Sequence, residues 1–285
     1  PSVVLLLVGL LYIFCGLYYK LPIPVQPLKA MAAIAIASGL GASVISAAGI
    51  LIGVILLFLS LSRWVNSLAR IFNRPIIRGM QLGIGLLLIK TSWSLMTKPI
   101  KINTQIDVGI PFNLVLLLGG IIMMLIFLLR KGFPAPIGML IFGITLSLFS
   151  GGANGLMPPF FPIQKIGLSI PPFSDFIQAF FLLVIPQLPL TLGNAVVGTK
   201  DVALKYFGEK AKRVTSGSLS ISMGVTNIVA GLSGGMPVCH GSGGLTAHYS
   251  FGARTGGACI IMGGLCLALS LIFGNRAIEV FRLIP

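Results

Sequence analysis

The sequence predicts an all-α integral membrane protein, a polytopic helical bundle that forms one transmembrane domain over residues 1–285. Apolar residues make up 56% of the chain and charged residues only 9%, whereas soluble domains carry about 25% charged residues. The apolar runs are long and lack the alternation of apolar and polar residues that is typical of membrane-spanning β-strands. We therefore expect a multi-pass protein, located in the cytoplasmic membrane if the source is prokaryotic.

About ten apolar runs are predicted to be membrane spans. The first run has no basic region before it, which favours a span over a signal peptide. Asn275 to Pro285 are expected to form a loop or the start of another span. The predicted spans cover residues 2–19, 25–38, 41–62, 76–96, 111–129, 134–150, 176–197, 214–232, 237–250 and 255–274.

The net charge of +15 lies mainly in short loops between the apolar runs, which indicates membrane topology and not nucleic-acid binding. Most of these loops fall on one side if the spans alternate in direction, so the first span is predicted to run inward. Lys98 and Lys101 are exceptions. Residues 64–73 mix apolar and basic residues at helical spacing, which is typical of an amphipathic surface helix or of an ordinary loop.

Two predicted spans are short and begin with proline. One begins Pro24-Val25-Gln26-Pro27 and the other begins Pro237-Val238-Cys239-His240. They are seven predicted spans apart, and a repeat of an odd number of spans must be inverted in the membrane. Paired, interrupted helices of this kind are typical of the binding sites of transporters. A helix that begins near the bilayer midplane presents unpaired N–H groups and a partial positive charge, which suits an anion.

Three stretches resemble the molybdate transporter family, which is related to the sulfate permeases. They are PVQPLKAMAAIAIA (24–37), IPQLPLTLGNAVV (185–197) and GGMPVCHGSGGLTAHYSFGARTGG (234–257), roughly a sixth of the chain. The resemblance implies a seven-plus-seven inverted-repeat transporter with two discontinuous half-helices, each preceded by a short strand. It also implies a chain truncated at both ends, with about ten of fourteen spans: residues 1–150 as the first repeat without its first helix, and 176–285 as an incomplete second repeat.

The two half-helix starts supply most of the predicted substrate-binding residues. Lys29 could add a charge to the site or extend to the lipid headgroups. His240 could donate to an oxyanion or be satisfied by a backbone carbonyl, and Cys239 could pack as a small apolar residue. The predicted residues at these starts are Gln26, Pro27, Lys29, Cys239, His240, Gly241, Ser242 and Gly243.

Gln187, Thr191 and Asn194 form a second predicted group, in the span at 176–197. Their spacing places all three on one helix face. Such polar groups face a cavity or join neighbouring helices by hydrogen bonds, and both roles remain open here. For Thr226 and Asn227 the joining role is favoured.

The few acidic residues and the histidine spacing argue against other kinds of site. None of the five acidic residues lies in the middle of a predicted span, which disfavours a cation pathway. His240 and His248 would lie about 12 Å apart along a helix, so a shared zinc is not expected. We predict no metal and no cofactor.

The predicted function is secondary active transport of a small tetrahedral oxyanion by alternating access, with the anion between the two half-helix N-termini. Molybdate is the expected substrate, and the alternatives are a sulfate permease, another anion or nucleobase permease, or an anion channel of the same fold. An enzyme is disfavoured, because adjacent residues such as Cys239 and His240 diverge on a helix. The lipid bilayer is an expected partner, nucleic acid is not, and a proton or sodium coupling ion and a homodimer are left open.

Overall fold

The structure is a computed structural model, and its longest apolar helices confirm a membrane protein. It describes residues 2–71, 74–96 and 167–277, with short helical pieces at 118–123, 125–126, 138 and 141–145. Four helical segments in this part are long and apolar enough to cross a membrane. They are α1 (Ser2–Tyr19), α3 (Ala42–Leu61), a segment at Phe173–Ala211, and one at Gly257–Arg276 that holds α13 (Gly257–Phe273).

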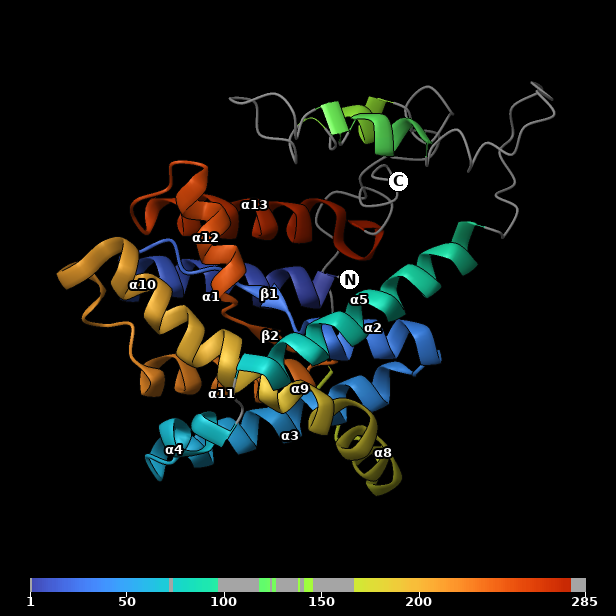
Figure 1. Cartoon of the computed structure of the whole chain (residues 1–285). Coiled ribbons are helices and arrows are strands. Elements are labelled where there is room, and N and C mark those ends of the chain that lie inside the picture. Colours follow the sequence, from blue (N-terminus) through green and yellow to red (C-terminus); the bar gives the residue numbers. More distant parts are fainter. Residues whose placement is uncertain are drawn as a thin grey trace.

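Two half-helices begin where two short strands meet (Figure 1). Strand β1 (Gln26–Pro27) leads into α2 (Lys29–Ser38), and β2 (Val238–Cys239) leads into α12 (Ser242–Ser250). The strands pair antiparallel, with Gln26 opposite Cys239 and Pro27 opposite Val238. Several of the largest fully buried side chains belong to the described segments around this pair: Tyr19, Ile23, Leu28, Leu192, Met223 and Leu245.

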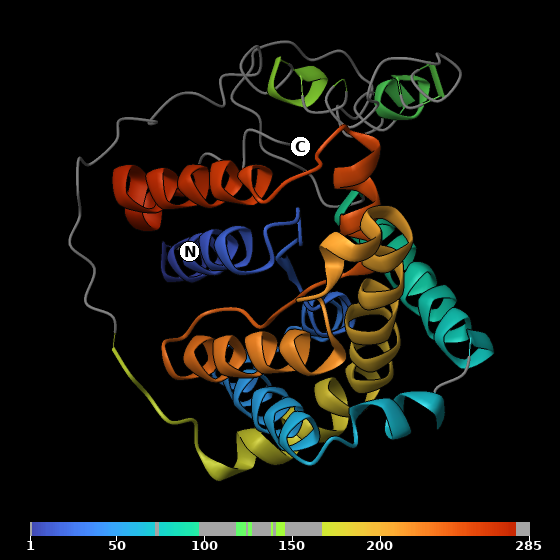
Figure 2. The same cartoon turned by 90° about the vertical axis from the view of Figure 1, so that its left-hand side faces the viewer.

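The same order of elements occurs twice in the described residues, as an internal repeat requires. The first copy is α1–β1–α2–α3, and the second is α11 (Ser216–Leu232), β2, α12 and α13. Helix α1 packs against α13, and α3 packs against α11 (Figure 2). The first helix of each copy therefore contacts the last helix of the other, as expected for two copies related by a two-fold axis.

Glycines allow both of these helix pairs to approach closely. A Cβ atom added at Gly263 of α13 would lie 2.6 Å from the carbonyl oxygen of Gly9 in α1. In the other pair, a Cβ atom added at Gly53 of α3 would lie 2.7 Å from the carbonyl oxygen of Gly224 in α11. Helices in membranes commonly associate through such small residues. Lipid is as apolar as large side chains, so the helices gain instead from the van der Waals attraction of close backbone contact.

The segment from Phe173 to Ala211 is longer than the predicted span at 176–197. It comprises α8 (Phe173–Ala179), a π-helix (Phe180–Val184), α9 (Ile185–Leu190), a second π-helix (Thr191–Gly198), α10 (Thr199–Phe207) and a 3-10 turn (Gly208–Ala211). Polar residues after 197 suggested an end to the span, but the helix continues. The π-turns lie beside Pro186 and Pro189, whose missing N–H groups disturb regular helical bonding.

The remaining described elements are α4 (Val65–Ile71), α5 (Arg74–Met96) and a 3-10 turn (Gly274–Arg276). Helix α4 lies within residues 64–73, where the sequence left a surface helix and an ordinary loop as alternatives. The predicted spans at 111–129 and 134–150 lie mostly outside the described residues, and residues 278–285 lie outside them entirely.

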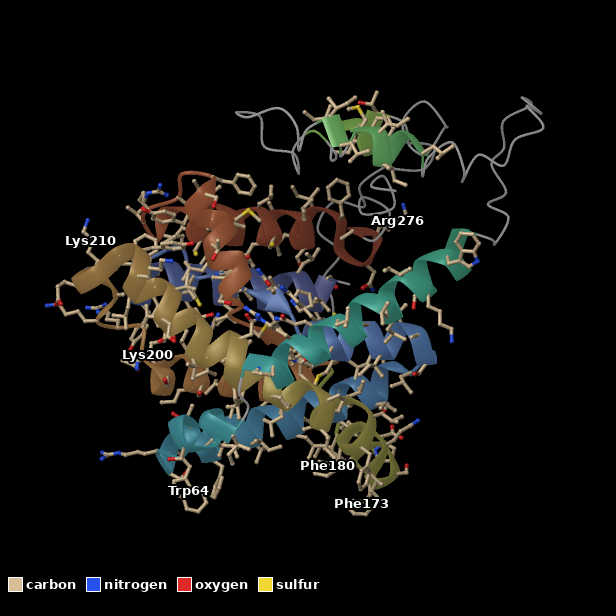
Figure 3. The ribbon with its side chains drawn as sticks, in the orientation of Figure 1. Trp64, Phe173, Phe180, Lys200, Lys210 and Arg276 are labelled. Carbon is tan, nitrogen blue, oxygen red and sulfur yellow. The ribbon has the colours of Figure 1, made fainter. Side chains whose placement is uncertain are left out.

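Several basic residues gather at one end of the helices. The carbonyl oxygen of Lys20, after α1, accepts a hydrogen bond from Gly256 N, before α13. Arg213, before α11, donates to the carbonyl oxygen of Tyr18. Lys200 and Lys210 lie toward the same end, and Arg276 lies toward the other (Figure 3). This clustering agrees with the positive-inside topology expected from the sequence.

Gly263→Ala tests the close contact between α1 and α13. Alanine stabilises a helix by about 1 kcal/mol relative to glycine. Overpacking against Gly9 destabilises the protein by about 1–3 kcal/mol, so the melting temperature should fall. Gly264→Ala is the control, because a Cβ atom there meets no atom within 4 Å. Thermal unfolding of both purified variants measures the difference, and equal melting temperatures would contradict the packing argument.

Candidate functional site

A cavity of about 330 Å³ lies between the first turns of α2 and α12, the middle of the Phe173–Ala211 segment, and α5. Pockets of this size, lined by a few convergent polar groups, are typical small-ligand sites. It brings together six of the predicted residues and adds four others. The lining residues are Lys29, Gln81, Gly85, Gln187, Leu190, Asn194, Ala195, Cys239, Ser242 and Gly243.

The N-terminus of α12 lies at the wall of this cavity without a side-chain cap. Its N-cap residue is Gly241, in an extended conformation, and no side chain of the described residues accepts a hydrogen bond from the first turn. The N–H groups of Gly244 and Leu245 donate to the Gly241 carbonyl oxygen. The N–H groups of Ser242 and Gly243 have no acceptor within the helix, because they lie in its first turn. Both residues line the cavity. This end of α12 therefore offers donors and a partial positive charge.

The N-terminus of α2 is occupied differently. The side-chain carbonyl oxygen of Gln187 accepts hydrogen bonds from the N–H groups of Ala30 (2.9 Å) and Met31 (3.1 Å). Its amide nitrogen donates to the Thr191 hydroxyl at 3.0 Å. Gln187 and Thr191 are buried. Together they join α9 to α2 by hydrogen bonds, which is one of the two roles that the sequence left open for them.

Asn194 and Ser242 connect the Phe173–Ala211 segment to α12 inside the cavity. The Ser242 hydroxyl donates to the side-chain oxygen of Asn194. The Thr199 hydroxyl lies within hydrogen-bond distance of the backbone carbonyl oxygens of Asn194 and His240. With its oxygen held by Ser242, Asn194 presents an amide N–H₂ donor from a residue that lines the cavity.

The electrostatics of the cavity favour an anion. Lys29 is the only charged residue among the described lining residues, and it lies in the first turn of α2. A lysine at a helix N-terminus adds a full positive charge to a partial one, which is unfavourable unless an anion is near. The start of α12 adds a second partial positive charge, and no carboxylate belongs to the described lining.

His240 is completely buried and does not line the cavity. Its Nδ1 lies 2.9 Å from the carbonyl oxygen of Pro24, and its Nε2 lies 2.8 Å from the hydroxyl of Ser222. Both ring nitrogens are therefore engaged, so in this conformation the ring has none free for an anion. Of the two roles left open by the sequence, this geometry is that of a histidine satisfied by a backbone carbonyl.

The segment before β2 is held in a similar way. Asn227 donates to the Val238 carbonyl oxygen at 3.0 Å and accepts from the Val238 N–H at 2.7 Å. The Leu28 N–H donates to the Pro237 carbonyl oxygen at 3.1 Å. These bonds satisfy backbone groups that would otherwise be unpaired within the protein interior. Asn227 thus joins the elements, as the sequence favoured.

Gln26 lies against the first turn of α12. A Cβ atom added at Gly244 would lie 1.8 Å from the Gln26 amide nitrogen, and one at Gly241 would lie 3.0 Å from its amide oxygen. The glycines therefore make room for this side chain. Gln26, Pro27, Thr191 and Gly241 are absent from the cavity lining. Thr191 lies in the π-helix that supplies Asn194 and Ala195 to the lining, whereas Gln26 and Pro27 form β1 and Gly241 immediately precedes α12.

The sequence analysis missed Gln81 of α5, which lines the cavity from the opposite side. The available signal was a lone amide within the predicted span at 76–96. Ser222 was also missed, because nothing in the surrounding residues distinguishes it from the other serines of this span. Within the described residues, no group of three or more His, Cys, Asp or Glu side chains could hold a metal ion.

The fold is that of a membrane transporter domain. The structure is similar to the transmembrane domain of a cyanobacterium bicarbonate transporter, BicA, with a TM-score of 0.63 and 17% sequence identity, over 99% of this chain and 79% of that chain. The sequence matches the family described as "Molybdate transporter of MFS superfamily" over residues 1–88 and 179–285, more than half of the chain. The chain belongs to this molybdate transporter family.

Named relatives agree with this assignment. Molybdate transporter 2 of Arabidopsis thaliana is 28% identical over 328 residues, which span 100% of this chain and 68% of the relative. Molybdate transporter 1 of the same plant is 28% identical over 321 residues, with 97% and 69% coverage. Molybdate transporter 1 of Chlamydomonas reinhardtii is 37% identical over 119 residues, with 40% and 23% coverage. The predicted family and multi-pass membrane location are confirmed, and the relatives are transporters, not enzymes.

His240→Ala tests the structural position of this histidine. The change removes a partner from the Pro24 carbonyl oxygen and from Ser222, and a buried polar group left unpaired costs about 1–3 kcal/mol. The melting temperature should fall further than in His248→Ala, which removes a half-buried ring whose Nδ1 lies 2.9 Å from the Pro22 carbonyl oxygen. Thermal unfolding measures both, and equal shifts would reject the assigned difference.

Proposed function

We propose that this chain carries the transport site of a secondary active molybdate transporter. The observation that carries the proposal is the uncapped N-terminus of α12 at a cavity that also contains Lys29 and whose described lining has no carboxylate. This chemistry selects an anion. The family and the names of the relatives support molybdate as the anion.

A tetrahedral oxyanion accepts hydrogen bonds at all of its oxygens, and the cavity has matching donors. The N–H groups of Ser242 and Gly243 bind one side of the anion, the Asn194 amide binds another, and Lys29 balances its charge. Gln81 contributes an amide from α5. Gln187 holds the start of α2 in place, because both of its amide atoms are already bonded within the protein.

The walls of the cavity suggest how access alternates. The two half-helices belong to one unit, joined by the β1–β2 pair and by the bonds of His240. Helix α5 forms the facing wall through Gln81 and Gly85. Movement of the half-helix unit against α5 changes the side from which the cavity is reached, while the anion stays bound at the start of α12.

Sulfate is the second candidate substrate, because it has the same charge and tetrahedral shape as molybdate. The same donors would accept it, and the distinction depends on the size of the cage. Competition between the two anions in an uptake assay decides which one the site prefers.

Asn194→Asp provides the sharpest test of the site. The oxygen that accepts from Ser242 remains, but the donor nitrogen becomes a negatively charged oxygen, which repels a dianion. Molybdate uptake by the full-length protein in transport-deficient cells should fall to background. Asn275→Asp is the matched control, because Asn275 also accepts from a serine hydroxyl, that of Ser2, and lies outside the cavity.

Three outcomes of this assay would contradict the proposal. Absence of molybdate uptake by the wild-type full-length protein would reject the function. Normal uptake by Asn194→Asp would reject the site while leaving the function in place. Equal losses in both variants would show a general effect of the added charge.

Lys29→Gln tests the charge at the start of α2. A charge-assisted hydrogen bond contributes about 1.5–3 kcal/mol, so the KM for molybdate should rise about tenfold or more. Lys200→Gln, on α10 away from the cavity lining, is the control and should keep the wild-type KM. Uptake measured over a range of molybdate concentrations gives both values. An unchanged KM in Lys29→Gln would reject a role of this lysine in binding the anion.

A further inference from the structure

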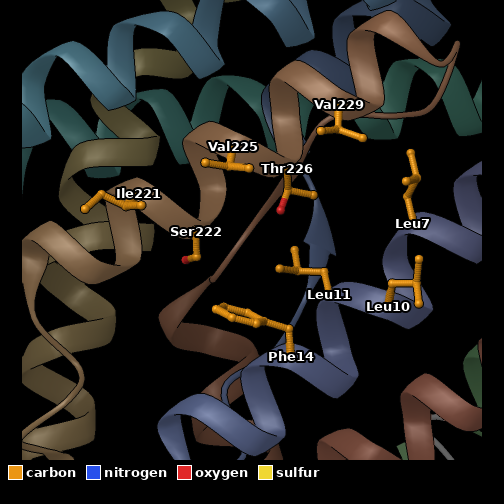
Figure 4. A pocket seen from close by; sticks show the side chains of 9 residues that line it. All are labelled: Leu7, Leu10, Leu11, Phe14, Ile221, Ser222, Val225, Thr226 and Val229. Carbon is orange, nitrogen blue, oxygen red and sulfur yellow. The ribbon is translucent and has the colours of Figure 1, made fainter. Parts of the chain in front are cut away.

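A second cavity, of about 310 Å³, lies between α1 and α11 (Figure 4) and shares no lining residue with the first cavity. Its walls are mainly aliphatic and aromatic side chains: Leu7, Leu10 and Phe14 of α1, with Ile221, Val225 and Val229 of α11. We call this cavity the α1–α11 groove. It lies between the first helices of the two repeat copies, so the two helices supply similar apolar faces to it.

The walls of the α1–α11 groove remain open in the described part of the chain. Leu10 is 51% exposed, Phe14 is 48% exposed and Val225 is 50% exposed. On a soluble protein such a patch would indicate a protein partner. Here α1 has the length and composition of a membrane span, so the acyl chains of the bilayer are the apolar molecules available to such a groove.

Two polar side chains, those of Ser222 and Thr226, belong to the groove lining, and that of Ser222 is already satisfied. Its hydroxyl donates to the Leu219 carbonyl oxygen at 3.0 Å, and it lies 2.8 Å from His240 Nε2. It also lies 3.2 Å from the Tyr19 hydroxyl. An apolar occupant therefore leaves this group no less bonded than before, which removes the main penalty for covering it.

A cationic side chain, that of Arg213, lies at one end of the groove. The Phe14 ring, in the groove wall, stacks on Tyr18 with ring centroids 5.5 Å apart. The guanidinium of Arg213 lies 5.8 Å from the centroid of the Tyr18 ring and donates through Nη1 to the Tyr18 carbonyl oxygen at 2.8 Å. Arg213 is exposed, as are the neighbouring Lys210 and Lys212. A guanidinium held in this way keeps further N–H donors for a phosphate.

We propose that the α1–α11 groove binds one anionic phospholipid, with an acyl chain between α1 and α11 and its phosphate at Arg213. The apolar walls match an acyl chain. The basic end lies at the start of α11 and the end of α1, where a span meets the headgroup region. Basic residues beside grooves between transmembrane helices are the usual means of recognising anionic headgroups.

The test compares two lipids and two pairs of variants. Wild-type protein and variants are purified in detergent and titrated with phosphatidylglycerol or phosphatidylcholine, with binding read by native mass spectrometry. Val225→Trp fills the groove, and Val54→Trp on α3 is its control, because Val54 is 51% exposed and lies outside the groove. Arg213→Gln removes the cation, and Lys212→Gln is the control for charge.

We expect the wild-type protein to prefer phosphatidylglycerol. Arg213→Gln should weaken its binding about fivefold, as expected for about 1 kcal/mol per basic residue near the membrane surface, and should leave phosphatidylcholine binding unchanged. Val225→Trp should weaken the binding of both lipids, while Val54→Trp and Lys212→Gln should bind both lipids as the wild type does.

Other outcomes would overturn the proposal. Wild-type binding of both lipids by Val225→Trp would show that the groove is not the site. An unchanged preference in Arg213→Gln would reject the role of the cation. A shift of Val225→Trp alone from dimer to monomer would assign the groove to a second copy of this chain. Variants that unfold would be recognised by loss of a single melting transition, and Val225→Leu would then replace Val225→Trp as a milder filling of the groove.

Discussion

The antiparallel pairing of β1 with β2 is the interaction on which the rest of the structure depends. Two extended segments enter the protein interior and meet there, and backbone groups within a membrane must find partners inside the protein. The strands satisfy part of this need. Asn227 and His240 satisfy more of it by bonding to Val238 and to the Pro24 carbonyl oxygen. Only with these bonds can two helices begin inside the bundle.

The two half-helix starts are related by symmetry in the fold but differ in chemistry. Gln187 accepts from the first N–H groups of α2, whereas no side chain in the described part of the chain accepts from those of α12. The repeat therefore supplies two similar frames, and the residues of the Phe173–Ala211 segment make one a structural joint and the other an open donor site. This difference places the proposed anion nearer to α12 than a symmetric cage would.

Close helix packing supports this arrangement. Gly9 with Gly263, and Gly53 with Gly224, bring the helices of the two copies into backbone contact. In a membrane the surrounding lipid is as apolar as the side chains, so the helices gain from close fit more than from removal of apolar surface from water. The groove between α1 and α11, by contrast, lacks such contact and leaves its apolar walls exposed.

Composition and proline placement were sufficient to predict the membrane class and the two half-helices, since these follow from local chain properties. The family followed from the resemblance of three stretches to its members. The residues at 185–197 and 237–243 also predicted where the cavity lies. The sequence could not decide what each polar group bonds, because Gln187 with Ala30 and His240 with Pro24 are far apart in the chain. Nor could it place Gln81 beside them. Only the tertiary structure determined which polar groups are used in holding the fold and which remain for a ligand, because hydrogen-bond partners are assigned by packing across the two repeats.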